Sequence, residues 1–477
     1  MRSAIDPRQR NVALLVAGCF FMENLDVTIV TTAAKRIGFS LHVASTTAGL
    51  LITAYLLTLA VLIPLSGWLT ARFGTRPVFL SAIVIFTLAS LGCAASANLG
   101  ELVGFRVLQG MGGAMMVPVG RLTVLSRAAK KDMIHLVSYV SWPGLVAPVI
   151  APLIGGLLTT YASWRWIFLI NAPLGVIAFA AAWRLIHSGE RATPPPLDRL
   201  GVLLTGVGLA GLTYAAHLLS DTNTPWGQVA GFGALSAVTL TASVRHLRRT
   251  PAPLLNLRTL RIPTFAASIG GSAIFWLAVG SAPFLLPLLF QNVFEWSAVK
   301  SGAVVLFLFV GNIVIKPATT PLLEHFGFRR VLIWTTVGLA ASMLASGFLT
   351  AGTPLVVIGR VAFIGGATRS TGLTCYVTMA YADLPPERMR DANTLYATTQ
   401  QLFSGLGVAV AAVALRLGSP IASVVGAHAS LSTAYTIAFV LIAVIALIPT
   451  VWAIRLHPTA GDALRRRGSQ GQPAAAS

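Results

Sequence analysis

The sequence predicts an all-α polytopic membrane protein, and three observations support that fold class. The chain of 477 residues is 55% hydrophobic and only 10% charged, which is unlike an ordinary soluble domain of this length. Apolar runs of about 20 residues, the length that crosses a bilayer as a helix, recur along it. Of the 34 lysines and arginines, 24 lie in every second connection between these runs, the pattern that the positive-inside rule describes.

The apolar runs predict fourteen transmembrane helices, because their length and continuity exclude the alternating pattern of a membrane β-barrel. The expected spans are residues 11–33, 46–68, 77–96, 101–125, 134–158, 165–186, 200–219, 227–246, 264–290, 301–323, 330–350, 354–378, 393–416 and 431–455. An even number of spans places both termini on one side of the membrane. The distribution of basic residues assigns that side to the cytoplasm, so we expect a protein of the inner membrane.

Two segments recur at a nearly constant separation and predict an internal repeat. Residues 73–78 resemble 326–331, and residues 104–107 resemble 358–361, at an offset of 253 or 254 positions. Parallel repeats of this kind are typical of transporters. The predicted parts are an N-terminal six-helix half (1–186), a cytoplasmic linker (187–199), two inserted helices with a basic loop (200–263), a C-terminal six-helix half (264–456) and a disordered cytoplasmic tail (457–477).

Charge and missing motifs exclude several classes of function. The net charge of +20 lies mostly in short loops, where it orients the chain against anionic lipid, so we expect no nucleic-acid partner. The sequence has no GxxxxGK[ST] phosphate loop, which excludes transport driven by ATP at such a site. It also has no HExxH motif and no clustered Cys/His spacing. We therefore expect no enzyme activity, no cofactor and no metal site.

Two carboxylates, Glu23 and Asp26, lie well inside a predicted span, and both belong to the first one. Their spacing of three residues places them on one face of a helix. A carboxylate at that depth is a candidate proton site, although each could instead be a structural anchor. Arg106, inside the fourth span, is the expected partner of Asp26, because its fixed charge would compete with a proton. A purely structural ion pair is the alternative.

Cations outnumber carboxylates inside the predicted spans. The cations are Arg106, Arg121, Lys316, Arg360 and Arg369. A cavity with this balance favours anions. We expect Arg121 and Lys316 to lie near helix ends and to extend toward the membrane interface. Arg360 and Arg369 are then the candidates for a substrate cavity, together with Gln109 of the fourth span.

Small and kinking residues recur in the fifth span. Gly144, Pro148, Pro152 and Gly156 follow one another at intervals of four, and Gly155 belongs to a second row of small residues. Such rows let another helix approach closely. Dense helix packing alone explains them; a seal between the two halves is the alternative.

The motifs resemble the major facilitator superfamily, and within it the fourteen-span branch of drug:proton antiporters of the EmrB/QacA type. Residues 25–30 match the first-helix signature of that branch, with Asp26 as its acidic residue. The other matches are 67–76 with the loop GxLaDrxGxrr, 106–110 with RxxqG, 148–156 with the antiporter motif GPxxGG, and 164–175 with WRWIFLINxPxG. Residues 110–124 are similar to the MdtD subgroup of the branch. The resemblance implies a major facilitator fold of two six-helix halves plus two inserted helices.

The loop after the second span carries Gly67, Arg72, Gly74 and Arg76 of its motif but departs from it at Ala71. In the family this position is an Asp, which caps a helix and pairs across the interface between halves. The offset of 253 makes Glu324 the equivalent residue of the second half. The resemblance therefore implies a gate that keeps its acidic residue on one side only.

The resemblance implies a secondary active transporter that exports small amphipathic molecules, including drugs, in exchange for protons across the inner membrane. Two alternatives stay open. One is a dedicated exporter of an organic anion or a metal chelate with little drug activity, and the other is a membrane receptor or scaffold that transports nothing. The expected partners are a small-molecule substrate, protons and the lipid bilayer; a periplasmic adaptor is a further partner that the sequence leaves open.

Overall fold

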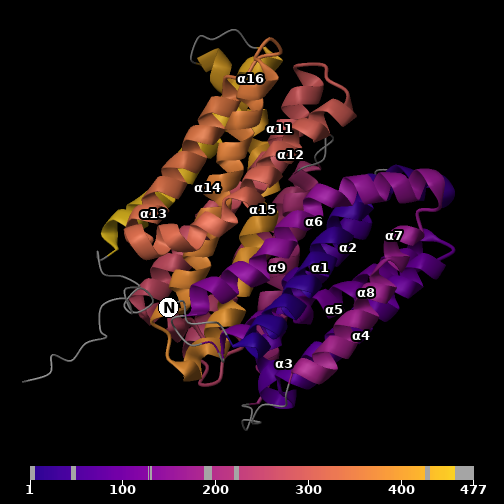
Figure 1. The fold of residues 1–477 in the computed structure, drawn as a ribbon, viewed down its shortest axis with the longest axis vertical. Coiled ribbons are helices and arrows are strands. Elements are labelled where there is room, and N and C mark those ends of the chain that lie inside the picture. Colours follow the sequence, from indigo (N-terminus) through magenta and orange to yellow (C-terminus); the bar gives the residue numbers. More distant parts are fainter. Residues whose placement is uncertain are drawn as a thin grey trace, which may run out of the picture.

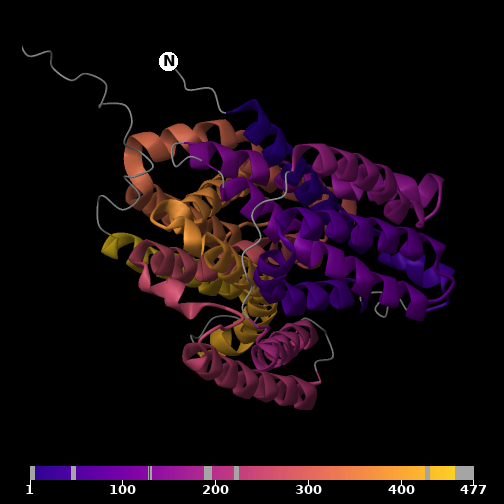
Figure 2. The ribbon, with the colours of Figure 1, turned by 90° about the horizontal axis from the view of Figure 1, so that it is seen from below.

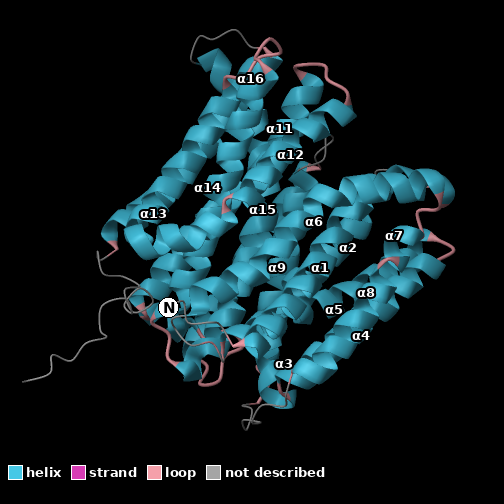
Figure 3. Cartoon of the chain, in the orientation of Figure 1, coloured by secondary structure: helices cyan, strands magenta, loops and turns pink. Residues whose placement is uncertain are grey.

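The computed structural model describes residues 6–43, 50–126, 128, 132–186, 196–219, 225–424 and 430–456. These residues form helices joined by short loops, and no strand occurs among them (Figure 3). The predicted all-α fold class is therefore confirmed. The predicted tail and the linker up to residue 195 lie outside the described residues, and the predicted boundaries of the parts stay a prediction.

The first group of helices runs to residue 185. It contains α1 (Pro7–Ser40), α2 (Leu50–Leu62), the 3₁₀ turn η2 (Ile63–Leu65), α3 (Ser66–Phe73), α4 (Thr75–Ala95), α5 (Leu99–Leu125), α6 (Met133–Tyr161), α7 (Trp166–Leu169) and α8 (Asn171–Leu185). Capping residues explain where two of these helices begin. Asp6 caps α1 just before Pro7, and Asn98 caps α5 by accepting a hydrogen bond of 2.9 Å from the Glu101 N–H.

The inserted pair consists of α9 (Arg199–Leu219) and α10 (Trp226–Arg249). The second group contains the 3₁₀ turn η4 (Leu257–Arg261), α11 (Pro263–Asn292), α12 (Ala298–Val314), α13 (Lys316–Gly347), α14 (Leu355–Ala382), the 3₁₀ turn η5 (Pro386–Arg388), α15 (Met389–Val424) and α16 (Leu431–Arg455). In Figure 1 the early helices lie at the lower right and the late ones at the upper left. The view from below shows α9 and α10 together at one edge of the bundle (Figure 2). There α9 packs against α2 and α15.

Eleven helices of the described residues are long and apolar enough to cross a membrane, and the bent helix pair within residues 135–159 of α6 makes a twelfth. The expected fourteen crossings are consistent with this count. Gly327 breaks α13 into two segments, which is consistent with one crossing by α12 with the first segment and another by the second segment. The fourteenth expected crossing corresponds to α14, a helix of 28 residues that contains Arg360 and Arg369.

Two glycines with positive φ show the internal repeat in the backbone. Gly74 has φ +87° where α3 ends and α4 begins, and Gly327 has φ +80° at the break in α13. Residues other than glycine rarely adopt this backbone conformation. The two positions are 253 residues apart, which is the offset found in the sequence. In both halves, therefore, a glycine with positive φ turns the chain between successive helices.

The two groups of helices meet along α15 and α6. The start of α15 contacts α2, α3 and α5, and α6 contacts α12, α13 and α14. At the first contact Arg121 of α5 donates a hydrogen bond of 3.1 Å to Gln400 Oε1, and Asn393 donates one of 2.9 Å to the Pro118 carbonyl. These residues lie near the end of α5 and the start of α15. The halves are thus joined at the end of the bundle that carries the Gly74 turn.

Candidate functional site

A buried ion pair lies at the centre of the first group of helices. Arg106 of α5 donates a hydrogen bond of 2.5 Å from Nη1 to Asp26 Oδ2 of α1, and both side chains are fully buried. Arg106 also donates from Nη1 to Gln109 Oε1 at 2.7 Å and from Nε to the Leu51 carbonyl at 3.2 Å. The structure therefore brings together the two residues whose pairing the sequence predicts.

Two amide side chains donate further hydrogen bonds to the Asp26 carboxylate. Gln109 donates to Asp26 Oδ1 at 2.9 Å, and Asn171 of α8 donates to the same oxygen at 2.8 Å. Both amides also donate to Ser90 Oγ of α4, at 2.6 and 3.1 Å. The carboxylate thus receives three donated hydrogen bonds, from α5 and α8. We call Asp26, Ser90, Arg106, Gln109 and Asn171 the Asp26 network.

Some polar atoms around the network have no hydrogen-bond partner among the described residues. They are Arg106 Nη2, Asn171 Oδ1 and Tyr55 Oη. The Arg106 guanidinium lies 4.5 Å from the centroid of the Tyr55 ring, which supplies a cation–π contact in place of a further acceptor. Arg106 Nη2 is therefore a donor that another acceptor could use.

Glu23 lies one turn before Asp26 on α1 and has a different environment. The residue is half-buried, and its Oε2 atom is buried without a hydrogen-bond partner among the described residues. The two acidic residues of α1 therefore share a helical face but not a set of partners. Gln109, which we had expected in a substrate cavity, is fully buried within the Asp26 network instead.

The second group of helices also buries charge, but without a carboxylate. Lys316 at the start of α13 is 7% exposed and donates a hydrogen bond of 2.6 Å to Thr374 Oγ1 of α14. Arg369 of α14 is half-buried, and its Nε and Nη1 atoms are buried with no acceptor among the described residues. The expectation that Lys316 extends to the membrane interface was wrong, because α14 covers it. Arg121 is likewise buried, at 9% exposure, where α5 meets α15.

Arg360 does not lie where the sequence predicted. It is exposed in the second turn of α14, next to the exposed apolar residues 355–357. The repeat aligns it with Arg106, but no buried carboxylate of the described residues receives it. The exposed Arg360 side chain therefore lies outside any buried cavity of the described residues, close enough to the helix end to extend to the membrane interface.

The predicted gating loop lies where the two halves meet. Gly67 of α3 packs against Thr394 of α15 so closely that a Cβ atom there would come 2.6 Å from Thr394 Oγ1. Arg76 donates a hydrogen bond of 3.0 Å to the Trp183 carbonyl of α8 and lies 5.0 Å from that ring, while Arg72 is exposed. Glu324 is exposed in α13, on the other half. The loop therefore contacts α8 and α15.

Ala71 is 6% exposed and lines a pocket at the same junction. The pocket also contains Asp198, which precedes α9, and Arg390 and Asp391, which begin α15. Arg390 Nε is buried there without a partner among the described residues. Where the family motif carries an Asp, this chain therefore has a methyl group in a pocket that Arg390 also lines.

The small residues of the predicted antiporter helix have unequal environments in α6. Gly144 is buried against the Phe20 ring of α1, so that α1 and α6 approach closely there. Gly155 is buried and Pro148 is half-buried, whereas Gly156 is exposed with open space around it. The side chain of Pro152 lies outside the described residues. Packing of α6 against α1 explains Gly144; contacts of α6 with α12, α13 and α14 leave the seal between halves as a prediction.

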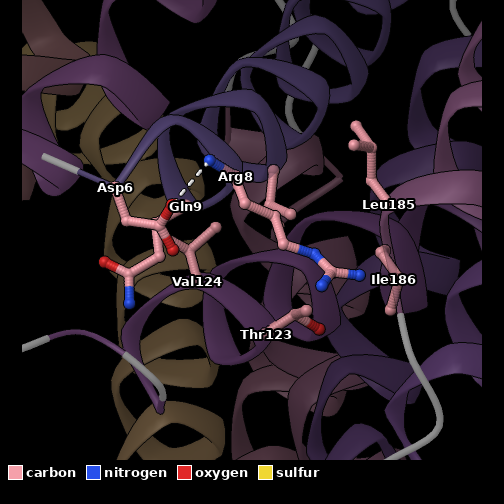
Figure 4. A pocket seen from close by; sticks show the side chains of 8 residues that line it. Asp6, Arg8, Gln9, Thr123, Val124, Leu185 and Ile186 are labelled. Carbon is pink, nitrogen blue, oxygen red and sulfur yellow. Dashed lines mark hydrogen bonds between the residues drawn. The ribbon is translucent and has the colours of Figure 1, made fainter.

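A pocket of about 280 Å³ at the start of α1 lies apart from these charges (Figure 4). It is lined by Asp6, Arg8, Gln9, Val12, Thr123, Val124, Leu185 and Ile186. None of these residues belongs to the Asp26 network, so we do not place the functional site there. Among the described residues, no group of His, Cys, Asp and Glu could hold a metal ion.

The sequence did not single out Ser90, Asn171 or Tyr55. Ser90 and Tyr55 stand alone in apolar runs, and nothing in the local sequence indicates that they face Asp26. Asn171 had a signal, because it is the amide residue of the motif at residues 164–175. A buried amide within an apolar span needs a partner, and Asp26 was the available acceptor.

Comparisons with known proteins agree with this architecture. The Major Facilitator Superfamily model matches residues 16–408. The MdtD proteins of Escherichia fergusonii and Escherichia coli, both named for multidrug resistance, are each 38% identical over 407 residues, which is 84% of this chain and 85% of theirs.

Solved structures show the same fold at low identity. The human organic anion transporter MFSD10 superposes with a TM-score of 0.65 at 13% identity, over 94% of this chain and all of the other. The proton:xylose symporter XylE superposes with a TM-score of 0.61 at 14% identity, over 95% of this chain and 96% of its own. The chain is a multi-pass membrane transporter, not an enzyme, and it belongs to the Major Facilitator Superfamily.

Proposed function

We propose that the protein exports small amphipathic molecules, including drugs, across the inner membrane in exchange for protons, with both termini in the cytoplasm. The observation that carries this proposal is the fully buried Asp26 carboxylate with its Arg106 partner inside the bundle. A buried ionisable group in a membrane span is costly and marks a functional pathway. The names of the MdtD relatives support the substrate class.

Asp26 would carry the proton. Protonation removes the charge that holds Arg106 and weakens each of the three donated hydrogen bonds, which are strong because the acceptor is ionised. Arg106 would then need another partner, and its free Nη2 allows it to rotate toward one. The donors come from α5 and α8, whereas Asp26 lies on α1. Protonation or deprotonation of Asp26 would therefore change the strength of the contacts between these three helices.

The fully buried carboxylate also explains why exchange needs a conformational change. Asp26 has no exposed surface in this structure, in which the halves are joined near Arg121 and Gln400. A proton can therefore reach it only when the bundle rearranges. Binding of substrate to one arrangement and of the proton to another then gives alternating access. Glu23, half-buried on the same face, would pass protons toward Asp26.

A second candidate function, export of an organic anion or a metal chelate with little drug activity, is favoured by Lys316 and Arg369. These buried cations have no acidic partner among the described residues. A cationic membrane drug would meet repulsion at such a place. Both candidates use the same Asp26 network, so one experiment tests the coupling that they share.

The test measures proton movement in liposomes that contain the purified protein and an internal pH dye, with rhodamine 6G, ethidium and fluorescein added in turn. Wild-type protein should move protons when it transports one of them. Asp26→Asn keeps the shape and an amide oxygen acceptor, and we expect it to lower substrate-driven proton flux by at least about 100-fold, to the level of empty liposomes.

Glu101→Gln is the matched control, because Glu101 is an exposed acidic residue of the α5 cap outside the network. It should leave flux unchanged. If Asp26→Asn retains wild-type proton flux, Asp26 is not the proton carrier. If no substrate moves protons through wild-type protein while substrate itself is transported, the antiport mechanism is wrong.

A further inference from the structure

The C-terminal half contains a group of polar residues between α12, α13 and α14 that the Asp26 mechanism does not use. We call Asn312, Lys316, Arg369, Ser370 and Thr374 the C-half cation site. Two of the five are cationic and none is acidic. Among the described residues the ion pairs are Arg106 with Asp26 and His246 with Asp198, and neither involves this site.

Helix packing brings the members together. Gly366 of α14 lies against the backbone of α12, where a side chain would strike the Leu308 carbonyl. Next along that face, Ser370 donates a hydrogen bond of 2.8 Å to the Asn312 carbonyl, and Lys316 donates one of 2.6 Å to Thr374. Ser370 and Thr374 are four residues apart and share one face of α14, whereas Asn312 lies near the end of α12 and Lys316 begins α13.

Arg369 lies beside this face. Ser370 faces α12, whereas Gly372 and Tyr376 pack against Phe275 and Gly271 of α11. Successive residues of a helix are rotated by about 100°, which places Arg369 between the stripe that faces α12 and the stripe that faces α11. Arg369 therefore lies on the inner side of the C-terminal half, one residue before Ser370, which bonds to the Asn312 carbonyl.

The site has unused hydrogen-bonding capacity. Asn312 is fully buried, and neither its Nδ2 nor its Oδ1 atom has a partner among the described residues. Arg369 Nε and Nη1 are buried without an acceptor as well. Native proteins seldom leave buried donors unpaired, because each costs free energy that water or another group would otherwise recover. A water molecule could accept these hydrogen bonds, but it would leave both positive charges uncompensated.

We propose that the C-half cation site binds a carboxylate group of the transported substrate. Arg369 would hold the carboxylate through its two free N–H donors, Lys316 would supply the second positive charge, and the Asn312 amide would donate to it. Planar guanidinium groups match carboxylates in this way. The proposal rests on the transport function proposed above and defines its substrates as amphipathic anions.

Fluorescein and rhodamine 6G test this choice, because they share a xanthene core but carry opposite charge. Binding of each dye to full-length protein in lipid nanodiscs is followed by fluorescence polarisation, and its export is followed in proteoliposomes. Wild-type protein should bind fluorescein at least tenfold more tightly than rhodamine 6G. Arg369→Gln and Lys316→Met should each weaken fluorescein binding at least tenfold and leave rhodamine 6G binding unchanged or stronger.

Arg360→Gln is the matched control, since Arg360 lies on the same helix but is exposed. It should bind fluorescein like wild type, and Arg369→Lys should restore part of the affinity that Arg369→Gln loses. The proposal is overturned if wild-type protein binds fluorescein no better than the two variants do, or if Arg360→Gln weakens binding as much as Arg369→Gln.

Asp26→Asn separates this proposal from the transport mechanism. One outcome is that fluorescein binding depends on Arg369 but Asp26→Asn leaves proton flux intact. The C-half cation site then binds anions as proposed, and a residue other than Asp26 carries the proton. If Asp26→Asn abolishes flux but dye charge and Arg369 make no difference to binding, the antiporter stands and the anion site is wrong.

Discussion

The N-terminal half pairs its buried Arg106 with a carboxylate, whereas the C-terminal half leaves Lys316 and Arg369 without an acidic partner among the described residues. Arg106 meets Asp26, Gln109 and the Leu51 carbonyl. Lys316 meets only the Thr374 hydroxyl, and Arg369 Nε and Nη1 meet no acceptor among the described residues. The backbone repeat of Gly74 and Gly327 shows that the halves share an architecture. Their buried chemistry has therefore diverged: one half pairs a buried arginine with a carboxylate, and the other leaves Lys316 and Arg369 without one among the described residues.

The largest expected effect is on stability, and it contrasts the two halves directly. Arg106→Met leaves Asp26 buried without its cation, which should cost about 3–5 kcal/mol. Arg369→Met removes a cation that has no acidic partner, so the free energy of unfolding should stay the same or rise. The measurement is the apparent melting temperature of each purified variant in one detergent, from intrinsic tryptophan fluorescence.

A fall with Arg369→Met as large as that with Arg106→Met would break the comparison, because it would mean that Arg369 already has a compensating partner. The double variant Asp26→Asn with Arg106→Met is a useful control. It removes both charges and should recover part of the loss, since replacing a complete buried pair costs less than breaking it.

The next effect concerns the junction of the halves. Ala71→Asp introduces a carboxylate into the pocket that Arg390 lines at the N-terminal end of α15, and Arg390 Nε lacks a partner among the described residues. We expect it to stabilise the closed junction by about 1–2 kcal/mol. A cysteine placed between the halves at the far end should then react faster with a maleimide. The native cysteines are buried and contribute little background.

Unchanged labelling with Ala71→Asp would show that this junction does not control the opposite opening. Ala71→Asn is the control, since it has the same shape without the charge and should give a much smaller change. Asp391, which also lines the pocket, sets an upper limit on the gain because it repels the new carboxylate.

A smaller change in the opposite direction is expected at Gly67. Gly67→Ala would place a methyl group 2.6 Å from Thr394 Oγ1 and push α3 away from α15, at a cost of about 1 kcal/mol. The same cysteine should then label more slowly. Thr394→Ala in the same chain should reverse the effect, and Gly104→Ala, which has open space around it, should cause none. If Gly104→Ala slows cysteine labelling equally, the effect comes from helix propensity and not from the contact between α3 and α15.

The smallest effect concerns a carboxylate outside the membrane. Asp198 accepts hydrogen bonds from His246 at 2.7 Å, the Gly201 N–H at 2.8 Å and the Leu254 N–H at 3.2 Å. Burial raises the pKa of Asp198, but these hydrogen bonds outweigh it and hold the pKa below its usual range. The stabilisation is therefore present above the usual pKa of about 3.9 and is lost as the pH falls through the lower pKa of the folded state.

Asp198→Asn should remove on the order of 1 kcal/mol from the docking of α9 and α10 at neutral pH. Amide hydrogen exchange in α9 should rise in the variant and approach the wild-type rate in strong acid. If wild-type exchange already rises between neutral pH and about pH 5, a group other than Asp198 controls the docking.

The sequence by itself determined the fold class, the internal offset and the pairing of Asp26 with Arg106. The apolar runs are long enough that only helices satisfy their backbone in lipid, so no tertiary information was needed. Opposite charges inside two spans also have few choices of partner, because an unpaired charge is costly there. The same reasoning failed for Arg360 and Lys316, because burial along a span depends on which neighbouring helix covers it.

Only the tertiary structure decided which residues complete each site. Ser90, Asn171 and Tyr55 come from α4, α8 and α2, and helix packing brings them to Asp26 or Arg106. Lys316 became a site residue because α14 approaches α12 closely at Gly366 and places Thr374 against it. Hydropathy and basic loops fix where a chain crosses the membrane, since each helix interacts with lipid independently. Which polar faces meet depends on contacts between helices far apart in sequence, and those are set by packing.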